Sequence, residues 1–156
     1  MGTTRPNQDT YLQALATLPS VNVVLGKFKR KRVRCGLAAC TYIGDKFFEI
    51  PEEKRTDVNI GIYMVDDAYR NRFDTLILVS GDSDLVPALN LVKARFPAKK
   101  IVVYVPTRNP IRGAAVELRA AADTNRDLPL NLLRLSQFPA QLPDGVGGFI
   151  NKPGTW

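Results

Sequence analysis

Apolar and polar positions along this chain repeat with periods that switch between helical and strand-like. Apolar residues at helical spacing predict a helix over residues 8–18, which Pro19 ends, and the next apolar run predicts a strand over residues 21–28. Val58, Ile62 and Val65 predict a helix over residues 57–67. Further predicted elements, in chain order, are a strand over 75–79, a helix over 85–96, a strand over 100–105, a helix over about 114–122 and a last strand over 130–135.

Residues 27–50 interrupt this pattern. A basic run is followed by a loop from Cys35 to Cys40, the turn signal Gly44-Asp45 and a short strand over 46–50. This composition predicts a basic hairpin inserted into the surrounding domain.

Continuous apolar strands that alternate with helices indicate a parallel sheet covered on both faces. The predicted fold class is therefore α/β, a three-layer sandwich with a mainly parallel central sheet. One domain is expected over residues 1–135, with the basic hairpin at about 27–50. Residues 136–156 are rich in Pro and Gly and predict an irregular C-terminal tail.

Composition narrows the class of partner and of chemistry. The 156 residues include 22 Lys and Arg against 15 Asp and Glu, a net charge of +7, which favours nucleic acid as the partner. Histidine is absent, which excludes Ser-His-Asp catalysis and His-ligated metal centres. No apolar run is long enough to cross a membrane and no signal peptide begins the chain, so a cytoplasmic protein is expected. The oligomeric state stays open, a homo-oligomer included.

The two cysteines, Cys35 and Cys40, cannot complete a tetrahedral zinc site within one chain without further Cys or His ligands. Reduced thiols are the expected state. A zinc ion shared across a dimer and a redox pair are the alternatives.

Three aspartates carry the candidate chemistry. The apolar run Leu76-Ile-Leu-Val-Ser-Gly-Asp-Ser-Asp84 ends in two carboxylates, Asp82 and Asp84, and Asp57 opens the helix predicted over 57–67. Ligands of open α/β sheets bind beyond the carboxyl ends of the strands, and a cluster of carboxylates suits Mg²⁺ or Mn²⁺. The alternative is that Asp82 or Ser83 only caps the helix that follows.

The basic run has two interpretations. Its cations lie close enough together to neutralise several phosphates of a nucleic acid. They are Lys27, Lys29, Arg30, Lys31, Arg32 and Arg34. The alternative is a solvated hairpin whose charges only keep it soluble. Tyr42, Phe47 and Phe48 could stack on bases or form the hairpin's own apolar face.

Several stretches together resemble the NYN domain, the LabA-like branch of the PIN-like metal-dependent ribonucleases. They are Glu52-Glu-Lys-Arg-Thr-Asp-Val-Asn-Ile60, residues 74–87 with Ser80-Gly-Asp-Ser-Asp84, Glu117-Leu-Arg-Ala-Ala-Ala-Asp123, and the closing Pro-x-x-Trp. The resemblance covers most of the chain after residue 50 and implies a PIN-like, Rossmann-related fold.

By this resemblance, Asp57, Asp82 and Asp84 hold one or two Mg²⁺ or Mn²⁺ ions that activate water against a phosphodiester. Asp123 would be a carboxylate behind the metal ligands or on the substrate side. Lys54 would pair with a phosphate or balance the acidic cluster.

Two serines and one absent motif complete the comparison with that family. Ser80 and Ser83 could offer hydroxyls to a phosphate, although Ser in a tight turn usually serves the backbone. The family normally begins with a strand that carries an Asp-Gly-x-Asn type motif, and no such strand precedes Gln8. Either the start was assigned too far downstream, or the protein is a truncated or repurposed member.

Two other functions stay open beside a metal-dependent ribonuclease. Some proteins that resemble this family are assigned as 6-hydroxy-3-succinoylpyridine 3-monooxygenase, a pyridine-ring hydroxylase of nicotine breakdown that would need NADH, with or without a flavin. The sequence has no Gly-rich dinucleotide loop between a strand and a helix to support that activity. A non-catalytic RNA-binding regulatory module is the third function.

Overall fold

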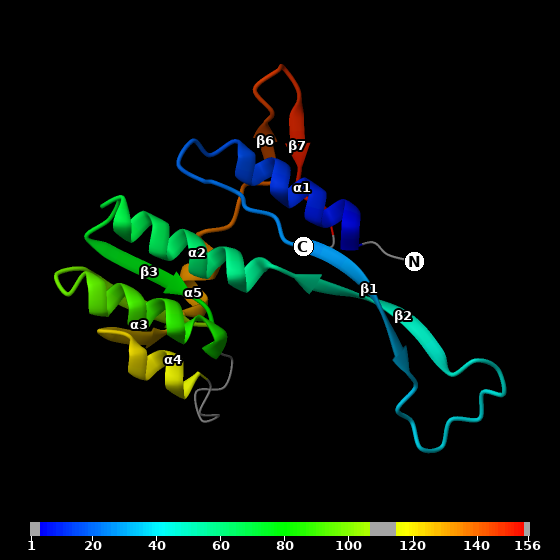
Figure 1. Cartoon of the computed structure of the whole chain (residues 1–156). Coiled ribbons are helices and arrows are strands. Elements are labelled where there is room, and N and C mark those ends of the chain that lie inside the picture. Colours follow the sequence, from blue (N-terminus) through cyan, green and yellow to red (C-terminus); the bar gives the residue numbers. More distant parts are fainter. Residues whose placement is uncertain (1–3, 107–114, 155–156) are drawn as a thin grey trace. The chain divides into compact units, whose positions relative to one another are not determined.

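The structure, a computed structural model, describes residues 4–106 and 115–154, with side chains from residue 7 onward (Figure 1). The chain divides into two compact units. One consists of residues 1–24 together with 129–156, and the other consists of residues 25–128.

A three-stranded parallel sheet forms the centre of the larger unit. The strands β3 (Thr75–Val79), β4 (Lys100–Val105) and β5 (Thr124–Asp127) lie in the order β3-β4-β5. Leu76 pairs with Ile101 across the first strand pair, and Val103 pairs with Asn125 across the second. The strands predicted at 75–79 and 100–105 are confirmed, as is the α/β class with a parallel sheet.

Three α-helices and one 3-10 turn pack against this sheet. They are α2 (Thr56–Tyr69), the 3-10 turn η1 (Ser83–Leu85), α3 (Val86–Arg95) and α4 (Val116–Ala121). The helices α2 and α3 contact each other. Leu89 and Val92 of α3 and Leu118 of α4 are fully buried against Ile101 and Val103 of β4.

The opposite face of the sheet is more open within this unit. Ile77 and Val79 of β3 are 61% and 54% exposed, whereas Leu78 between them is buried. Parallel strands are usually covered on both faces. The described residues of the larger unit therefore cover one face of β3 and leave the other accessible.

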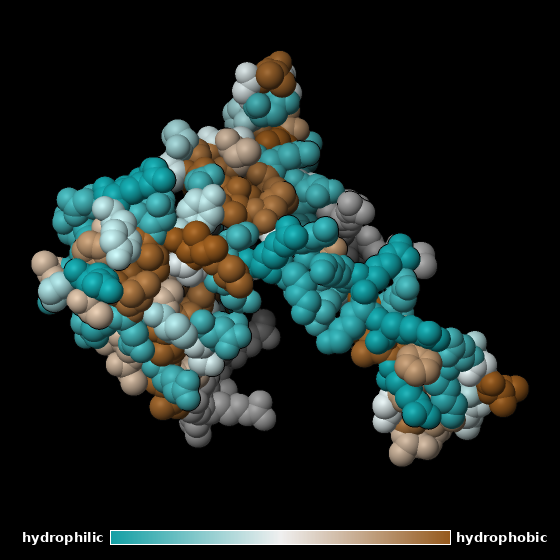
Figure 2. All heavy atoms as spheres, in the orientation of Figure 1, coloured by the Kyte–Doolittle hydropathy of each residue, from teal (hydrophilic) through white to brown (hydrophobic). Residues whose placement is uncertain are grey.

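The predicted basic hairpin is present and longer than expected. Strands β1 (Lys27–Arg34) and β2 (Phe47–Lys54) pair antiparallel over their whole lengths. Nearly every residue of both strands is exposed, and no member of the hydrophobic core belongs to them. Hydrophilic residues cover most of the hairpin surface visible in Figure 2. Its base is tight, since a Cβ on Gly26 would lie 2.9 Å from the carbonyl oxygen of Lys54.

Two sequence predictions were wrong, and one strand was missed. Residues 21–26 form no strand, because their backbone finds no partner strand, and Val21 instead closes a turn on the carbonyl of Leu18. Residues 130–135 are the helix α5 (Leu130–Leu135), because a short apolar run alone does not distinguish a helix from a strand. The strand β5 was missed because Thr-Asn-Arg-Asp has no apolar residue, and its pairing with β4 makes it a strand.

The smaller unit joins the two ends of the chain. Helix α1 (Thr4–Ala16) contacts β7 (Phe149–Asn151), which pairs antiparallel with β6 (Gln141–Pro143). The segment after residue 136 thus contains a hairpin, which its Pro and Gly content did not predict. The helix predicted at 8–18 is confirmed with an earlier start and end.

Candidate functional site

Two of the three candidate aspartates line one groove in the larger unit. Asp57 lies in the first turn of α2, where its negative charge interacts favourably with the helix dipole. Asp84 lies in η1, just after the carboxyl end of β3. Both line a groove of about 750 Å³ between α2 and α3. The predicted cluster consists of three aspartates, of which Asp57 and Asp84 share this groove and Asp82 does not line it.

The walls of this groove are largely apolar. Gly61 of α2 allows a close approach to α3, because a Cβ there would lie 3.5 Å from Cβ of Ala88. Val58 and Ile62 line the groove yet are 63% and 60% exposed. Tyr69, farther along α2, meets Phe96 edge to face at 4.9 Å between ring centroids. The groove therefore combines carboxylates with a hydrophobic strip along α2.

Asp82 has a structural task in addition to its candidate role. Its Oδ1 accepts a hydrogen bond from the backbone N–H of Asp84 at 2.9 Å and so caps η1. Its own N–H donates to Oγ of Ser80 at 3.1 Å. The capping interpretation thus applies to Asp82, while Asp57 and Asp84 have no such explanation in the local hydrogen bonds described.

The groove brings together fewer carboxylates than a dedicated metal cluster contains. Among residues 4–106 and 115–154, no three Asp, Glu or Cys side chains gather closely enough to form a metal cluster. Mg²⁺ is commonly bound by one or two carboxylates, its remaining ligands being water and substrate phosphate. Asp57 and Asp84 are two carboxylates that line the same groove, and Asp82 precedes Asp84 by two residues.

Asp123 and Asp84 lie at opposite ends of the parallel strands: Asp84 follows their carboxyl ends, and Asp123 lies near their amino ends. It precedes β5, and its Oδ2 accepts from the N–H of Ile101, near the start of β4, at 2.8 Å. Its Oδ1 pairs with Nζ of Lys93 at 3.1 Å. A strand of the length of β4 separates its two ends by roughly 20 Å. Asp123 therefore joins α3, β4 and β5 and lies apart from the groove.

Asp123 gives the fold a testable dependence on acid. The Ile101 N–H and then the Lys93 ammonium hold the pKa of Asp123 below its usual value. A carboxylate with a lowered folded-state pKa stabilises the protein above the unfolded pKa of about 3.9, and this contribution is lost as pH falls through the folded-state pKa. Urea unfolding at pH 7 and pH 3.5 should show a smaller acid-induced loss in Asp123→Asn than in the parent. An equal loss in both would contradict this assignment, and Asp67→Asn controls for the change in charge.

The remaining polar candidates make local contacts. Ser80 accepts from Asp82 as described, and its N–H extends the pairing of β3 by donating to Tyr104 O at 3.1 Å. Ser83 begins η1, and its carbonyl accepts from Val86 N–H. Nζ of Lys54 lies 3.0 Å from Oε2 of Glu52 in the hairpin. None of these three residues lines the groove.

The six cations of the basic run all lie on β1, where successive side chains point to opposite faces. Arg30 pairs with Glu49 at 2.9 Å, Lys31 with Glu52 at 2.8 Å, and Arg32 with Asp45 at 2.7 Å. Lys27, Lys29 and Arg34 make no ion pair with another described residue. Part of the run is thus neutralised by the hairpin itself. Cys35 and Cys40 at its far end are free thiols.

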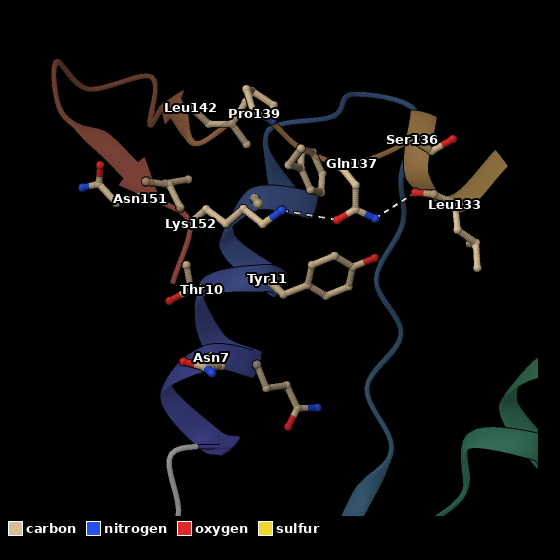
Figure 3. Close-up of a pocket in the computed structure, with 14 residues that line it drawn as sticks. Asn7, Thr10, Tyr11, Leu133, Ser136, Gln137, Pro139, Leu142, Asn151 and Lys152 are labelled. Carbon is tan, nitrogen blue, oxygen red and sulfur yellow. Dashed lines mark hydrogen bonds between the residues drawn. The ribbon is translucent and has the colours of Figure 1, made fainter. Parts of the chain in front are cut away.

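A second hollow of about 670 Å³ lies in the smaller unit (Figure 3). Tyr11 of α1 lies edge to face with Phe138 at 6.2 Å between ring centroids. Nζ of Lys152 donates to Oε1 of Gln137 at 3.4 Å, and Nε2 of Gln137 donates to the carbonyl of Leu133 at 2.8 Å. No carboxylate stands among the described residues that line this hollow.

Asp66 also lines the groove and was not among the sequence candidates. Both of its carboxylate oxygens lie 2.9 Å from Nε of Arg70, one turn further along α2. Its position four residues after Ile62 and eight after Val58 was the available signal, since residues at these spacings share one helix face.

Comparison with known proteins finds one matching family model and one similar enzyme. A family model described as NYN domain matches residues 12–129. The enzyme 6-hydroxy-3-succinoylpyridine 3-monooxygenase HspA of Pseudomonas putida (strain DSM 28022 / S16) is 32% identical over 106 residues, which are 67% of this chain and 33% of the relative. This chain thus spans about a third of the length of that curated relative. No solved structure matches the chain. No helix in the described part of the chain has the length and apolar character to span a bilayer.

Proposed function

Because the chain belongs to the NYN domain family, a family of PIN-like nuclease domains, we propose that it hydrolyses phosphodiester bonds of RNA with Mg²⁺ or Mn²⁺. The observation that carries this proposal is the shared groove of Asp57 and Asp84, at the carboxyl end of β3. This end of an open α/β sheet is where ligands bind in such folds.

Each carboxylate has a distinct part in the proposed mechanism. Asp57 and Asp84 would hold the ion from the two sides of the groove, and Asp82 would stand beside them while its Oδ1 keeps η1 in place. A divalent ion there supplies activation of a water molecule and stabilisation of the leaving oxygen of the phosphodiester. The short η1 turn would hold Asp84 in place relative to β3, so that the carboxylates of Asp57 and Asp84 are positioned before the substrate binds.

The charge of the protein and the surface of α2 support RNA as the proposed substrate. The net charge of +7 favours a polyanion, and the exposed apolar strip of α2 offers a surface on which bases can lie beside the carboxylates. Lys54 and Ser80 have local partners, and this proposal gives neither of them a direct part.

The test is cleavage of a labelled single-stranded RNA by the full chain with Mn²⁺ or with EDTA. Cleavage should require the metal and should fall at least about tenfold in Asp57→Asn, which removes one ionic ligand. Asp67→Asn is the matched control, because Asp67 lies on the same helix but pairs with Arg72 outside the groove. Equal cleavage in EDTA, or equal loss in the two variants, would contradict the proposal.

The pyridine-ring hydroxylase receives no support from a specific observation in this chain. The similarity to that monooxygenase covers about a third of its length, and the groove described above presents carboxylates and aliphatic side chains. An RNA-binding module without catalysis is the outcome that remains if RNA binds and no divalent metal produces cleavage.

A further inference from the structure

The two faces of the β1–β2 hairpin carry very different net charge. Pairing places Lys27 opposite Lys54, Lys29 opposite Glu52 and Lys31 opposite Ile50, and side chains of directly opposed residues lie on the same face. This lysine face, defined by Lys27, Lys29, Lys31 and Lys54, thus holds four ammonium groups and the carboxylate of Glu52 alone.

The other face is balanced. This arginine face, defined by Arg30, Arg32 and Arg34, also holds Glu49 and Glu53 by the alternation of the strands. Asp45 of the loop pairs with Arg32 at 2.7 Å, so three carboxylates stand against three guanidinium groups. The guanidinium of Arg32 also lies 4.5 Å from the ring centroid of Phe47. Arg30 and Arg32 are therefore already engaged within the hairpin, and the face as a whole carries no net charge.

The lysine face contains an unfavourable contact that an anion would relieve. Lys27 and Lys54 oppose each other directly, and like charges in that position destabilise a strand pair. Glu52 is shared between Lys31 at 2.8 Å and Lys54 at 3.0 Å, and these two ammonium groups lower the pKa of Glu52. Lys27 and Lys29 have no carboxylate of their own among the described residues.

Spacing and an exposed ring indicate the kind of anion. Lys27, Lys29 and Lys31 follow one another at every second residue, about 6.7 Å apart along the strand. That separation is comparable to the separation of successive phosphates in an extended nucleic-acid strand. Phe48 lies on the same face farther out and is 52% exposed, so an unpaired base can stack on it.

We propose that the lysine face of the hairpin binds single-stranded RNA, with the phosphates along Lys27, Lys29 and Lys31 and a base on Phe48. This inference rests on the proposed function for the identity of the polymer, and it adds the surface that holds it. A duplex fits less well, because its bases are stacked inside and cannot reach Phe48. The arginine face, being neutral, takes no part in the contact.

Binding is measured in EDTA by fluorescence anisotropy of a labelled single-stranded 12-nucleotide RNA with the full chain, so that cleavage does not interfere. The triple variant Lys27→Gln/Lys29→Gln/Lys31→Gln should bind roughly tenfold more weakly at low salt. Its plot of log affinity against log salt should be shallower by about 2, since each phosphate contact on a single strand contributes about 0.7. The matched control Arg30→Gln/Arg32→Gln/Arg34→Gln removes the same formal charge and should bind nearly as the parent does.

A second pair of variants tests the ring. Phe48→Ala should weaken binding by about 1 to 3 kcal/mol, which is roughly fivefold to more than a hundredfold, whereas Phe47→Ala on the arginine face should not. Equal losses in the two triple variants, or no loss in either, would overturn the proposal, as would tighter binding of a duplex. Circular dichroism verifies that every variant is folded. Because these readouts need no catalysis, they can succeed where the cleavage test fails, and the reverse also holds.

Discussion

Asp82→Asn is expected to abolish metal-dependent RNA cleavage, with a loss of about a hundredfold or more, and to leave folding almost unchanged. The loss in rate follows from removing a negative charge two residues before Asp84, close to the divalent ion that the proposed transition state needs. Folding is spared because the Asn side chain retains an oxygen that accepts the N–H of Asp84, as Oδ1 of Asp82 does. The measurements are initial cleavage rates in Mn²⁺ and the free energy of unfolding in urea.

Asp82→Ala separates the two tasks of this residue. It removes both the charge and the acceptor, so it should lose the same activity and, in addition, about 1 kcal/mol of stability from the lost cap. If Asp82→Asn cleaves RNA as fast as the parent while Asp82→Ala is less stable, Asp82 is a helix cap and the metal-binding role is wrong.

Leu89→Ala is expected to cost about 3 kcal/mol of the free energy of unfolding, the largest effect on stability among these predictions. Leu89 is fully buried in α3 and belongs to the cluster that joins α2, α3, α4 and the sheet. Truncating a buried Leu removes its transfer free energy and leaves a cavity. The measurement is chemical unfolding followed by circular dichroism.

The control makes the same substitution two residues further along the same helix. Leu91 is 41% exposed on the wall of the groove, so Leu91→Ala should cost less than about 1 kcal/mol. Similar losses at the two positions would mean that the cluster around Leu89 does not dominate the stability of this unit.

The elements that sequence alone predicted are those whose side chains decide their structure. The apolar strands β3 and β4 and the amphipathic helix α2 carry their period in their own residues, and each was placed within a few positions. The strand β5 depends on hydrogen bonds to β4, and helix α5 on a run of leucines compatible with either state. β5 was missed and α5 was misassigned, because the contacts that decide their structure lie outside their own segments.

The same distinction applies to the candidate site. A strand that ends in Ser-Gly-Asp-Ser-Asp and a helix that opens with Asp57 were enough to bring two carboxylates to one edge of the sheet. The position of Asp123 could not be deduced, since its place at the opposite edge depends on how β5 pairs with β4. The charge asymmetry of the hairpin likewise depends on register, which composition does not specify.

The hairpin contributes no side chain to the hydrophobic core, and this has a consequence for how such a protein can evolve. If the lysine face binds an extended strand as proposed, substitutions there change that affinity without touching Leu89 or the carboxylates of the groove. Selection could then alter which polymers the protein captures while the folding equilibrium and the proposed chemical step stay constant. Related sequences should accordingly diverge in the length and charge of this hairpin sooner than in the segments that surround Asp57 and Asp84.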